Sequence, residues 1–263
     1  MVINSGGPGA ESRRLAQESE AALQRARNAA DPAERDRQLA EAVAKAGDSE
    51  LAAAYTYLQR AVGIIAVLLP PSLVLGNWLF GGKLLGSISA YYYTHMGNAF
   101  VGSLWALAVF FLSYNYRPLQ SFELDNTLGR VASVAAVGVA VFPTARDAAS
   151  VSGGERLVSV LHLVCAAVLF GLLGIFSHFL FTKTKDPASM TPEKRRRNRL
   201  YRICGKVIFA SIALVLVNNA LKLPASWHLL LVLETVCVLS FGTSWLVKGG
   251  FLGILADKTP PAP

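Results

Sequence analysis

The sequence predicts an all-α fold, a polytopic membrane protein with a six-transmembrane-helix bundle and an N-terminal cytoplasmic helical extension. Apolar, almost charge-free stretches lie near 61–80, 96–114, 128–145, 157–182 and 203–248, and the last is long enough to cross a bilayer twice. A spanning helix needs about 20 predominantly apolar residues. Hydrophobic residues make up 53% of the chain and charged residues only 16%, so the chain is more apolar than a typical soluble domain. Both observations place most of the chain in lipid.

The chain is expected to have three parts, with boundaries read from composition. Residues 1–56 form the cytoplasmic helical extension, whose first ten or so residues are disordered; residues 57–250 form the transmembrane domain; residues 251–263 are a cytoplasmic tail. The first apolar run begins near residue 61, so the first spanning helix is expected to act as its own insertion signal.

The extension is expected to contain two helices. Asp31-Pro32-Ala33-Glu34 reads as an N-cap, a proline at the first helical position and a nearby glutamate, which restarts a helix after Asn28-Ala29-Ala30. Gly47-Asp48-Ser49 is expected to end that helix and to cap the next. The apolar stripe is mostly alanine, so two interpretations stay open: a solvated flexible extension, or a docking or self-association element.

In the first membrane helix, Pro70-Pro71 removes two backbone donors where lipid offers no substitute. A kink or a break is expected there. A broken helix can line a binding cavity, whereas a simple kink is structural.

Basic residues set the expected orientation, because cytoplasmic loops are enriched in Lys and Arg. Arg117 follows the second helix, and nine basic residues follow the fourth: Lys183, Lys185, Lys194, Arg195, Arg196, Arg197, Arg199, Arg202 and Lys206. The alternate loops hold few: Lys83, Arg146, Arg156 and Lys222. Both termini are therefore expected in the cytoplasm and the protein in a cell inner membrane.

The net charge of +8 does not indicate nucleic-acid binding, because the basic residues cluster at helix ends and in one loop. Thr191-Pro192-Glu193 looks like a helix start, so the basic run after it can lie as a helix at the inner surface. Six residues are expected to contact anionic lipid head groups there: Lys194, Arg195, Arg196, Arg197, Arg199 and Arg202. The alternative is that this run is only a topology determinant.

Polar residues in the outer third of the predicted bundle form the candidate site. With alternating helix directions, one layer would hold Tyr91, Tyr92, His95, Asn98, His162, Asn218, Asn219, His228 and Glu234. Tyr91, Tyr92 and Asn98 are three or four residues from His95 and so are expected on its helix face. Ionisable groups inside a membrane are costly and are candidate functional groups by default.

Glu234 interrupts a largely apolar run and needs a partner, for which His162, Asn218 and Asn219 are candidates. His95, His162 and His228 come from three different helices and could together bind zinc, leaving a fourth position for water. That arrangement would suit hydrolysis of a lipid amide or ester. No cofactor is expected, because ordinary interhelical hydrogen bonding is the simpler role for these histidines; zinc is the alternative.

Several segments carry a resemblance: Ser87-Ile-Ser-Ala-Tyr-Tyr-Tyr-Thr94, Phe142-Pro-Thr144, Lys194-Arg-Arg-Arg-Asn-Arg-Leu-Tyr-Arg-Ile-Cys-Gly205 and Phe241-Gly-Thr-Ser-Trp-Leu-Val-Lys-Gly249. Over roughly 60–250 the chain resembles uncharacterised bacterial six-helix membrane proteins, near the assemblage that includes the damage-regulated autophagy modulators. The resemblance implies architecture and no reaction. A fainter similarity is to ceramidase-like membrane hydrolases, from which the chain departs in helix number and in lacking a His-x-x-x-His pair on its last helix.

Three function classes remain open at this point. The first is a non-enzymatic integral membrane protein that binds lipid or a protein partner through an outward-facing polar layer. The second is a zinc-dependent lipid hydrolase of ceramidase-like type, and the third is a small transporter or channel. Membrane lipids, including anionic head groups at the cytoplasmic face, are the expected partners.

Overall fold

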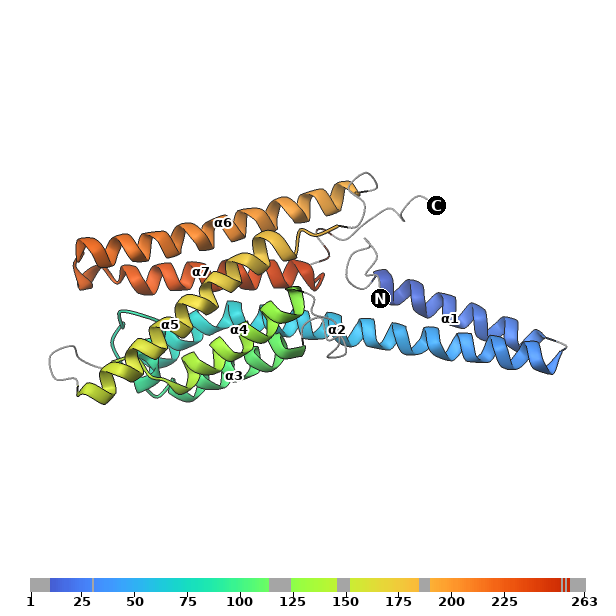
Figure 1. Cartoon of the computed structure of the whole chain (residues 1–263), viewed down its shortest axis with the longest axis horizontal. Coiled ribbons are helices and arrows are strands. Elements are labelled where there is room, and N and C mark those ends of the chain that lie inside the picture. The colour runs from blue at the N-terminus through green and yellow to red at the C-terminus, as the bar shows by residue number, and fades with distance from the viewer. Residues whose placement is uncertain are drawn as a thin grey trace. The chain divides into compact units, whose positions relative to one another are not determined.

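The computed structural model describes residues 10–29, 31–113, 124–145, 152–184, 190–251, 253 and 255. Helices make up 84% of the described residues, which contain no β-strand. The elements are α1 (Ala10–Asn28), α2 (Pro32–Leu79), η1 (Ser89–Tyr93), α3 (Gly97–Ser113), α4 (Leu124–Val141), α5 (Gly153–Ile175), η2 (Phe176–Leu180), α6 (Pro192–Leu221), η3 (Ala225–Trp227) and α7 (Leu229–Lys248) (Figure 1). The all-α prediction is confirmed for this part of the chain.

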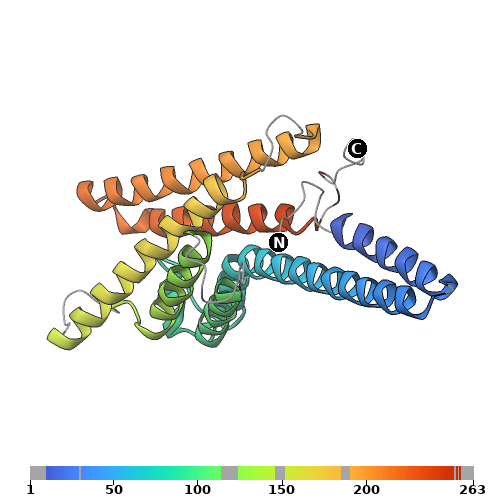
Figure 2. The same ribbon diagram turned by 45° about the vertical axis from the view of Figure 1, so that its right-hand side comes forward.

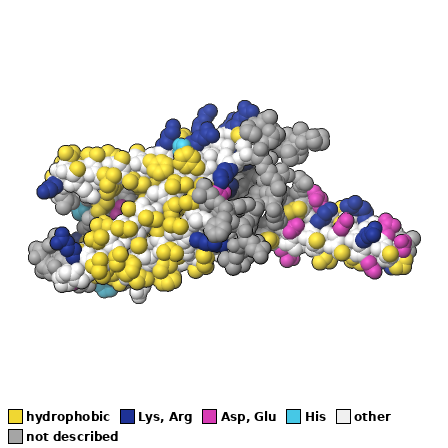
Figure 3. Space-filling model, in the orientation of Figure 1, with side chains coloured by type: hydrophobic (Ala, Val, Ile, Leu, Met, Phe, Trp, Pro, Cys, Tyr) yellow, Lys and Arg dark blue, Asp and Glu magenta, His cyan; other side chains and the backbone are white. Residues whose placement is uncertain are grey.

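Four helices are long and apolar enough to span a membrane: α2, α5 with its continuation η2, α6 and α7. Only 28–39% of their most apolar windows is buried inside the protein, so most of these apolar side chains face outwards. Figure 3 shows a broad hydrophobic surface with Lys and Arg side chains near its ends. A soluble protein would have to hide such a surface, whereas a bilayer covers it. These helices indicate a membrane protein.

The chain forms two compact units. The first comprises Met1–Ala61, Thr184–Arg199 and Trp245–Pro263, and the second comprises Val62–Lys183 and Leu200–Ser244. In the second unit, α3, α5 and α7 run in one direction and α2, α4 and α6 in the other (Figures 1 and 2). α3 packs on α4 and α4 on α5. α3 and α4 are therefore each antiparallel to the next helix along the chain and pack against it.

Close helix approach in the second unit depends on glycine. A methyl group at Gly205 of α6 would lie 2.9 Å from the backbone nitrogen and Cα of His178 in η2. A methyl group at Gly242 of α7 would lie 2.7 Å from Cγ2 of Val67 in α2. Small residues let membrane helices approach closely enough for extensive van der Waals contact. Such contacts, rather than a hydrophobic core alone, hold α5 against α6 and α2 against α7.

The double proline does not break α2, which continues to Leu79. Pro70 and Pro71 leave the carbonyls of Ala66 and Val67 without their usual donors four residues on. That turn of α2 is the one that Gly242 packs against. Packing of a neighbouring helix over the interrupted turn is one way in which membrane proteins tolerate proline. Of the two expected outcomes, a kink or a break, the break is therefore absent.

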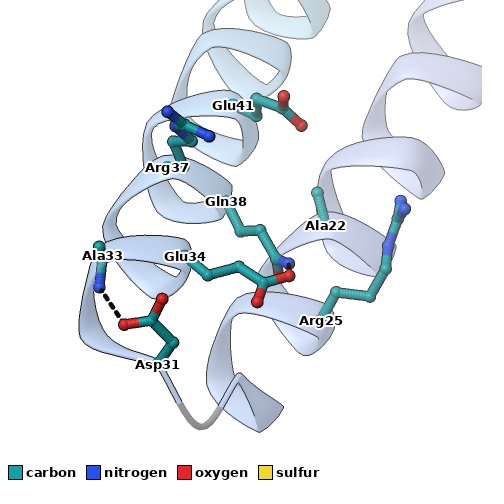
Figure 4. Close-up of a pocket in the computed structure, with 8 residues that line it drawn as sticks. All are labelled: Ala22, Arg25, Asp31, Ala33, Glu34, Arg37, Gln38 and Glu41. Carbon is teal, nitrogen blue, oxygen red and sulfur yellow. Dashed lines mark hydrogen bonds between the residues drawn. The ribbon is translucent and has the colours of Figure 1, made fainter.

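In the first unit, α1 and the start of α2 form a helical hairpin. As predicted, the chain breaks after Asn28 and restarts at Pro32, where the Asp31 carboxylate accepts a hydrogen bond from Ala33 N at 3.1 Å (Figure 4). The helices pack through small residues, with Ala22, Ala26 and Ala42 buried. Figure 4 shows Glu34, Gln38 and Arg25 near the turn, where charged and polar side chains line a groove of about 540 Å³.

The predicted helix end at Gly47-Asp48-Ser49 is wrong, because α2 runs through it without interruption. Instead of capping a new helix, the Ser49 hydroxyl donates a hydrogen bond to Ala46 O at 2.8 Å, within the same helix. Because this hydroxyl bonds to a carbonyl of its own helix, it does not act as the N-cap of a new one.

The predicted start of α6 is confirmed, since Thr191 Oγ1 accepts a hydrogen bond from Lys194 N at 3.1 Å and the helix begins at Pro192. The basic run is therefore the first part of α6 itself. Three of the basic residues used for orientation, Arg117, Arg146 and Lys185, lie outside the described residues, as do the first nine residues and most of the C-terminal tail.

Candidate functional site

The centre of the candidate site is the partly buried Glu234 of α7. Its Oε2 accepts a hydrogen bond from the backbone N–H of Ile88 at 2.6 Å. Ile88 precedes η1, and Ala90 N donates to Ser87 Oγ at 3.1 Å at the same end of that turn. The first N–H groups of a helix have no partner within it and must be satisfied from outside. A carboxylate from α7 therefore caps a short helix far away in sequence.

Three residues separate η1 from α3, namely Thr94, His95 and Met96, and the backbone of Thr94 is extended (φ −109°, ψ 179°). The Thr94 hydroxyl donates to Tyr91 O at 2.7 Å and accepts from Met96 N at 3.1 Å, so one side chain both ends η1 and precedes α3. The prediction that Tyr91, Tyr92 and Asn98 share a helix face with His95 is therefore wrong. Tyr91 and Tyr92 lie on η1, His95 lies in the connection, and Asn98 lies on α3.

The tyrosines and His95 have different surroundings. Tyr91 is buried, and its hydroxyl accepts a hydrogen bond from Leu85 N at 3.4 Å. Tyr92 packs edge-on against Tyr93, with ring centroids 5.0 Å apart. His95 is exposed and stacks on Phe80 at 5.0 Å, and Asn98 is exposed as well. Only Tyr91 of these residues belongs to the protein interior.

His162 of α5 is buried and holds the end of α4. Its Nδ1 donates to the carbonyl of Phe142 at 2.6 Å. The segment that follows is fixed by two further bonds: Tyr93 Oη donates to Thr144 O at 2.7 Å, and Ala145 N donates to Ser159 Oγ at 3.3 Å. The last carbonyls of a helix need such partners. His162 and η1 thus brace the same short segment.

Glu234 and His162 line one small cavity in the second unit, of about 60 Å³. Ser89 contributes the third polar side chain, and the rest of the lining is apolar, including Leu104, Leu107, Phe111, Leu169 and Phe241. A water molecule needs about 10–15 Å³ of such cavity volume, so the cavity has room for several waters or for a slender apolar group.

The cavity has a polar end and an apolar end. On α7 the lining residues in order are Glu234, Val238 and Phe241, and on α5 they begin with His162 and end at Leu173. Spacings of three and four residues place each set on one helix face. From Glu234 to Phe241 is about 10 Å along the helix axis. Because α5 and α7 run in the same direction (Figure 1), their polar lining residues lie at one end of the cavity and their apolar lining residues at the other.

The other predicted members of the layer do not join this cavity. Asn218 is partly buried and Asn219 is exposed, and neither lines it. His228 lies just before α7 with a positive φ of 48°, and its Nδ1 is buried without a hydrogen-bond partner in the structure. None of the partners predicted for Glu234 bonds to it. The backbone N–H of Ile88, just before η1, does.

The histidines are not assembled into a ligand set. Across the described ranges, no group of three or more His, Cys, Asp or Glu side chains could hold a metal ion. His95 is stacked on Phe80 and His162 uses Nδ1 for Phe142. The predicted zinc triad of His95, His162 and His228 is therefore not brought together in this structure.

The basic run at the start of α6 has two kinds of residue. Arg195, Arg196, Arg199 and Arg202 are exposed, as is Lys206. Lys194 and Arg197 are buried, and the Arg197 guanidinium donates to Leu255 O. These two are therefore not positioned to contact lipid head groups as predicted. The exposed set Arg195, Arg199, Arg202 and Lys206 has the spacing of a single helix face.

Sequence reasoning missed the elements that complete the site, namely Ile88, Ser89 and the carbonyl of Phe142. Phe142 precedes Pro143, and a residue before proline favours an extended conformation, which signals a helix end with unsatisfied carbonyls. Ser87 and Thr94 at the two ends of η1 are typical capping residues. Those signals mark a turn between Leu85 and Gly97, although they do not identify Glu234 as its partner.

A scan against protein-family models, a search of curated proteins and a search of solved structures each found no match to this chain. The fold and site by themselves define an all-helical membrane protein with a small cavity that is polar at one end.

Proposed function

We propose that this chain is a non-enzymatic, multi-pass inner-membrane protein that binds an amphiphile in the cavity between Glu234 and Phe241. The observation that carries the proposal is the Glu234 carboxylate, which lies at the polar end of an apolar cavity and forms no ion pair with a described residue. A carboxylate in lipid without a positive partner is expensive and is retained for a function. An apolar cavity with a few convergent polar groups is the usual form of a small-molecule site.

The proposal includes six membrane spans and cytoplasmic termini. Besides the four long helices, α3 with 17 residues and α4 with 18 extend about 26–27 Å, close to the hydrocarbon thickness of about 30 Å. Alternating helix directions in the second unit support this count (Figure 1). Asp125 at the start of α4 forms an ion pair with Lys183, which follows η2, so these two helix ends lie on one side. That side is the one with most basic residues.

The exposed basic face of α6 is proposed to contact anionic head groups at the cytoplasmic surface. Lys206 is its last member, and the same face continues with apolar exposed residues such as Phe209 and Val217. A change from basic to apolar along one helix face is typical of the membrane interface.

The binding proposal is tested by filling the cavity. Ala166 lines it from α5, whereas Val164 on the same helix is exposed. Native mass spectrometry of protein extracted in mild detergent would detect a co-purifying amphiphile in the wild type and in Val164→Phe, and would find it lost in Ala166→Phe. Equal retention by both variants would place the amphiphile outside the cavity and reject the proposal.

A further inference from the structure

The polar end of the cavity is lined by Glu234 and His162, and the hydrogen bonds that these two side chains already make narrow the ligand chemistry. The inference rests on the amphiphile binding proposed above. Because a carbonyl can only accept, the bond to Phe142 O requires a proton on His162 Nδ1. In a neutral imidazole the other ring nitrogen is then an acceptor. Beside a cation Glu234 is ionised and is acceptor-only: one oxygen is already bonded to Ile88 N, and the other forms no hydrogen bond with a described residue.

Ser89 does not reverse this pattern. Its hydroxyl lies 3.2 Å from that of Ser87, and either oxygen can be the donor in that pair. No Lys or Arg side chain lines the cavity, as far as the structure describes its walls. A ligand that brings a second carboxylate or a phosphate would meet a like charge and would leave acceptors unpaired, which is costly away from water.

We infer that the amphiphile carries a primary ammonium group, whose N–H donors bind Glu234 while its apolar chain extends along α7 towards Phe241. An ammonium group supplies the positive charge that the structure does not provide for Glu234, and a charge-assisted hydrogen bond is roughly twice as strong as a neutral one. The lining at the other end of the cavity is apolar, which suits a hydrocarbon chain.

The test compares three probes of equal chain length: octylamine, octanol and octanoate. Binding is measured by equilibrium dialysis at neutral pH on protein in phosphatidylcholine nanodiscs, with empty nanodiscs subtracted. Octylamine is expected to bind at least tenfold more tightly than octanoate, with octanol between them. Glu234→Gln keeps an oxygen acceptor for Ile88 N but removes the charge, and is expected to remove most of the preference for the amine. Exposed Glu50→Gln is the matched control and is expected to change nothing.

Two failures can be told apart. If octanoate binds as tightly as octylamine, or if Glu234→Gln leaves the preference intact, the ammonium inference is wrong while amphiphile binding stands. If none of the three probes binds above empty nanodiscs, and Ala166→Phe retains the co-purifying amphiphile as the wild type does in native mass spectrometry, both the inference and the proposed function are rejected.

Discussion

The backbone nitrogen of Ile88 lies 2.6 Å from Oε2 of Glu234, across 146 residues of sequence. This bond joins the turn before α3 to the first third of α7, and it also fixes one carboxylate oxygen at the polar end of the cavity. The same contact therefore serves the fold and the candidate site. Its two roles separate in variants, because an amide keeps the hydrogen-bond acceptor and loses the charge.

Glu234→Ala is expected to destabilise the protein by about 1–3 kcal/mol, because it leaves the buried Ile88 N–H without a partner. Glu234→Gln should cost much less. Thermal unfolding in detergent measures both. Equal loss in the two variants would show that the charge, and not the hydrogen bond, stabilises η1.

His162→Ala is expected to lower the unfolding temperature, since Phe142 O loses its donor at the end of α4. His95→Ala should have little effect, because His95 is exposed and contacts Phe80 by stacking alone. The same unfolding assay gives the comparison. A larger loss for His95→Ala would contradict the assignment of His162 as the bracing residue.

Gly205→Ala is expected to destabilise by about 1–3 kcal/mol, because the new methyl group would meet backbone atoms of His178 that cannot turn away. Gly171→Ala on α5 is the control. A methyl group there meets nothing within 4 Å, so it should be neutral or stabilise by up to about 1 kcal/mol through helix propensity. Unfolding temperatures that change in the same direction for both would argue against close packing at Gly205.

Neutralising Arg195, Arg199, Arg202 and Lys206 to Gln is expected to reduce enrichment of phosphatidylglycerol around the protein, by about 1 kcal/mol for each residue near the surface. Arg197→Gln should leave that enrichment unchanged and lower stability instead, because Arg197 is buried and bonds to Leu255 O. Lipid analysis of co-purified protein measures the first effect. Unchanged enrichment in the fourfold variant would leave this face with no lipid role.

Six spans predict that single cysteines at Lys83 and Lys222 react with an impermeant thiol reagent from outside the cell, and that one at Arg196 does not. The background must lack Cys165, Cys204 and Cys237. A cysteine at Lys222 that reacts only in broken cells would contradict the orientation. One at Lys83 and one at Lys222 that lie on opposite sides would contradict the number of spans.

Long-range pairing explains where prediction from sequence succeeds and fails. The length of the apolar runs predicted the long helices. Asp31 and Thr191 correctly predicted two helix starts, because a helix cap depends on neighbours within four residues. Gly47 did not end α2, and Pro70-Pro71 did not break it, since surrounding contacts override such local signals. The buried Arg197 bonds to the backbone of Leu255, 58 residues further along the chain, a pairing that no periodicity reveals.

In the candidate site, too, the residues that local sequence signals mark were predicted and their long-range partners were not. Glu234 and His162 were recognisable as costly polar groups in apolar runs, and the structure brings them to one cavity. Their partners, Ile88 N and Phe142 O, are backbone atoms, and a backbone atom has no sequence signature. For that reason the sequence alone does not show whether the three histidines converge, and in the structure they do not.

The most direct test of the central claim is the unfolding temperature of the protein with increasing octylamine, measured beside Ala166→Phe and Val164→Phe. A ligand that binds only the folded state stabilises it in proportion to the logarithm of its concentration once the site is saturated. The account predicts a rising unfolding temperature for the wild type and Val164→Phe, and none for Ala166→Phe. An equal rise in all three, or in none, would contradict binding in the cavity beside Glu234.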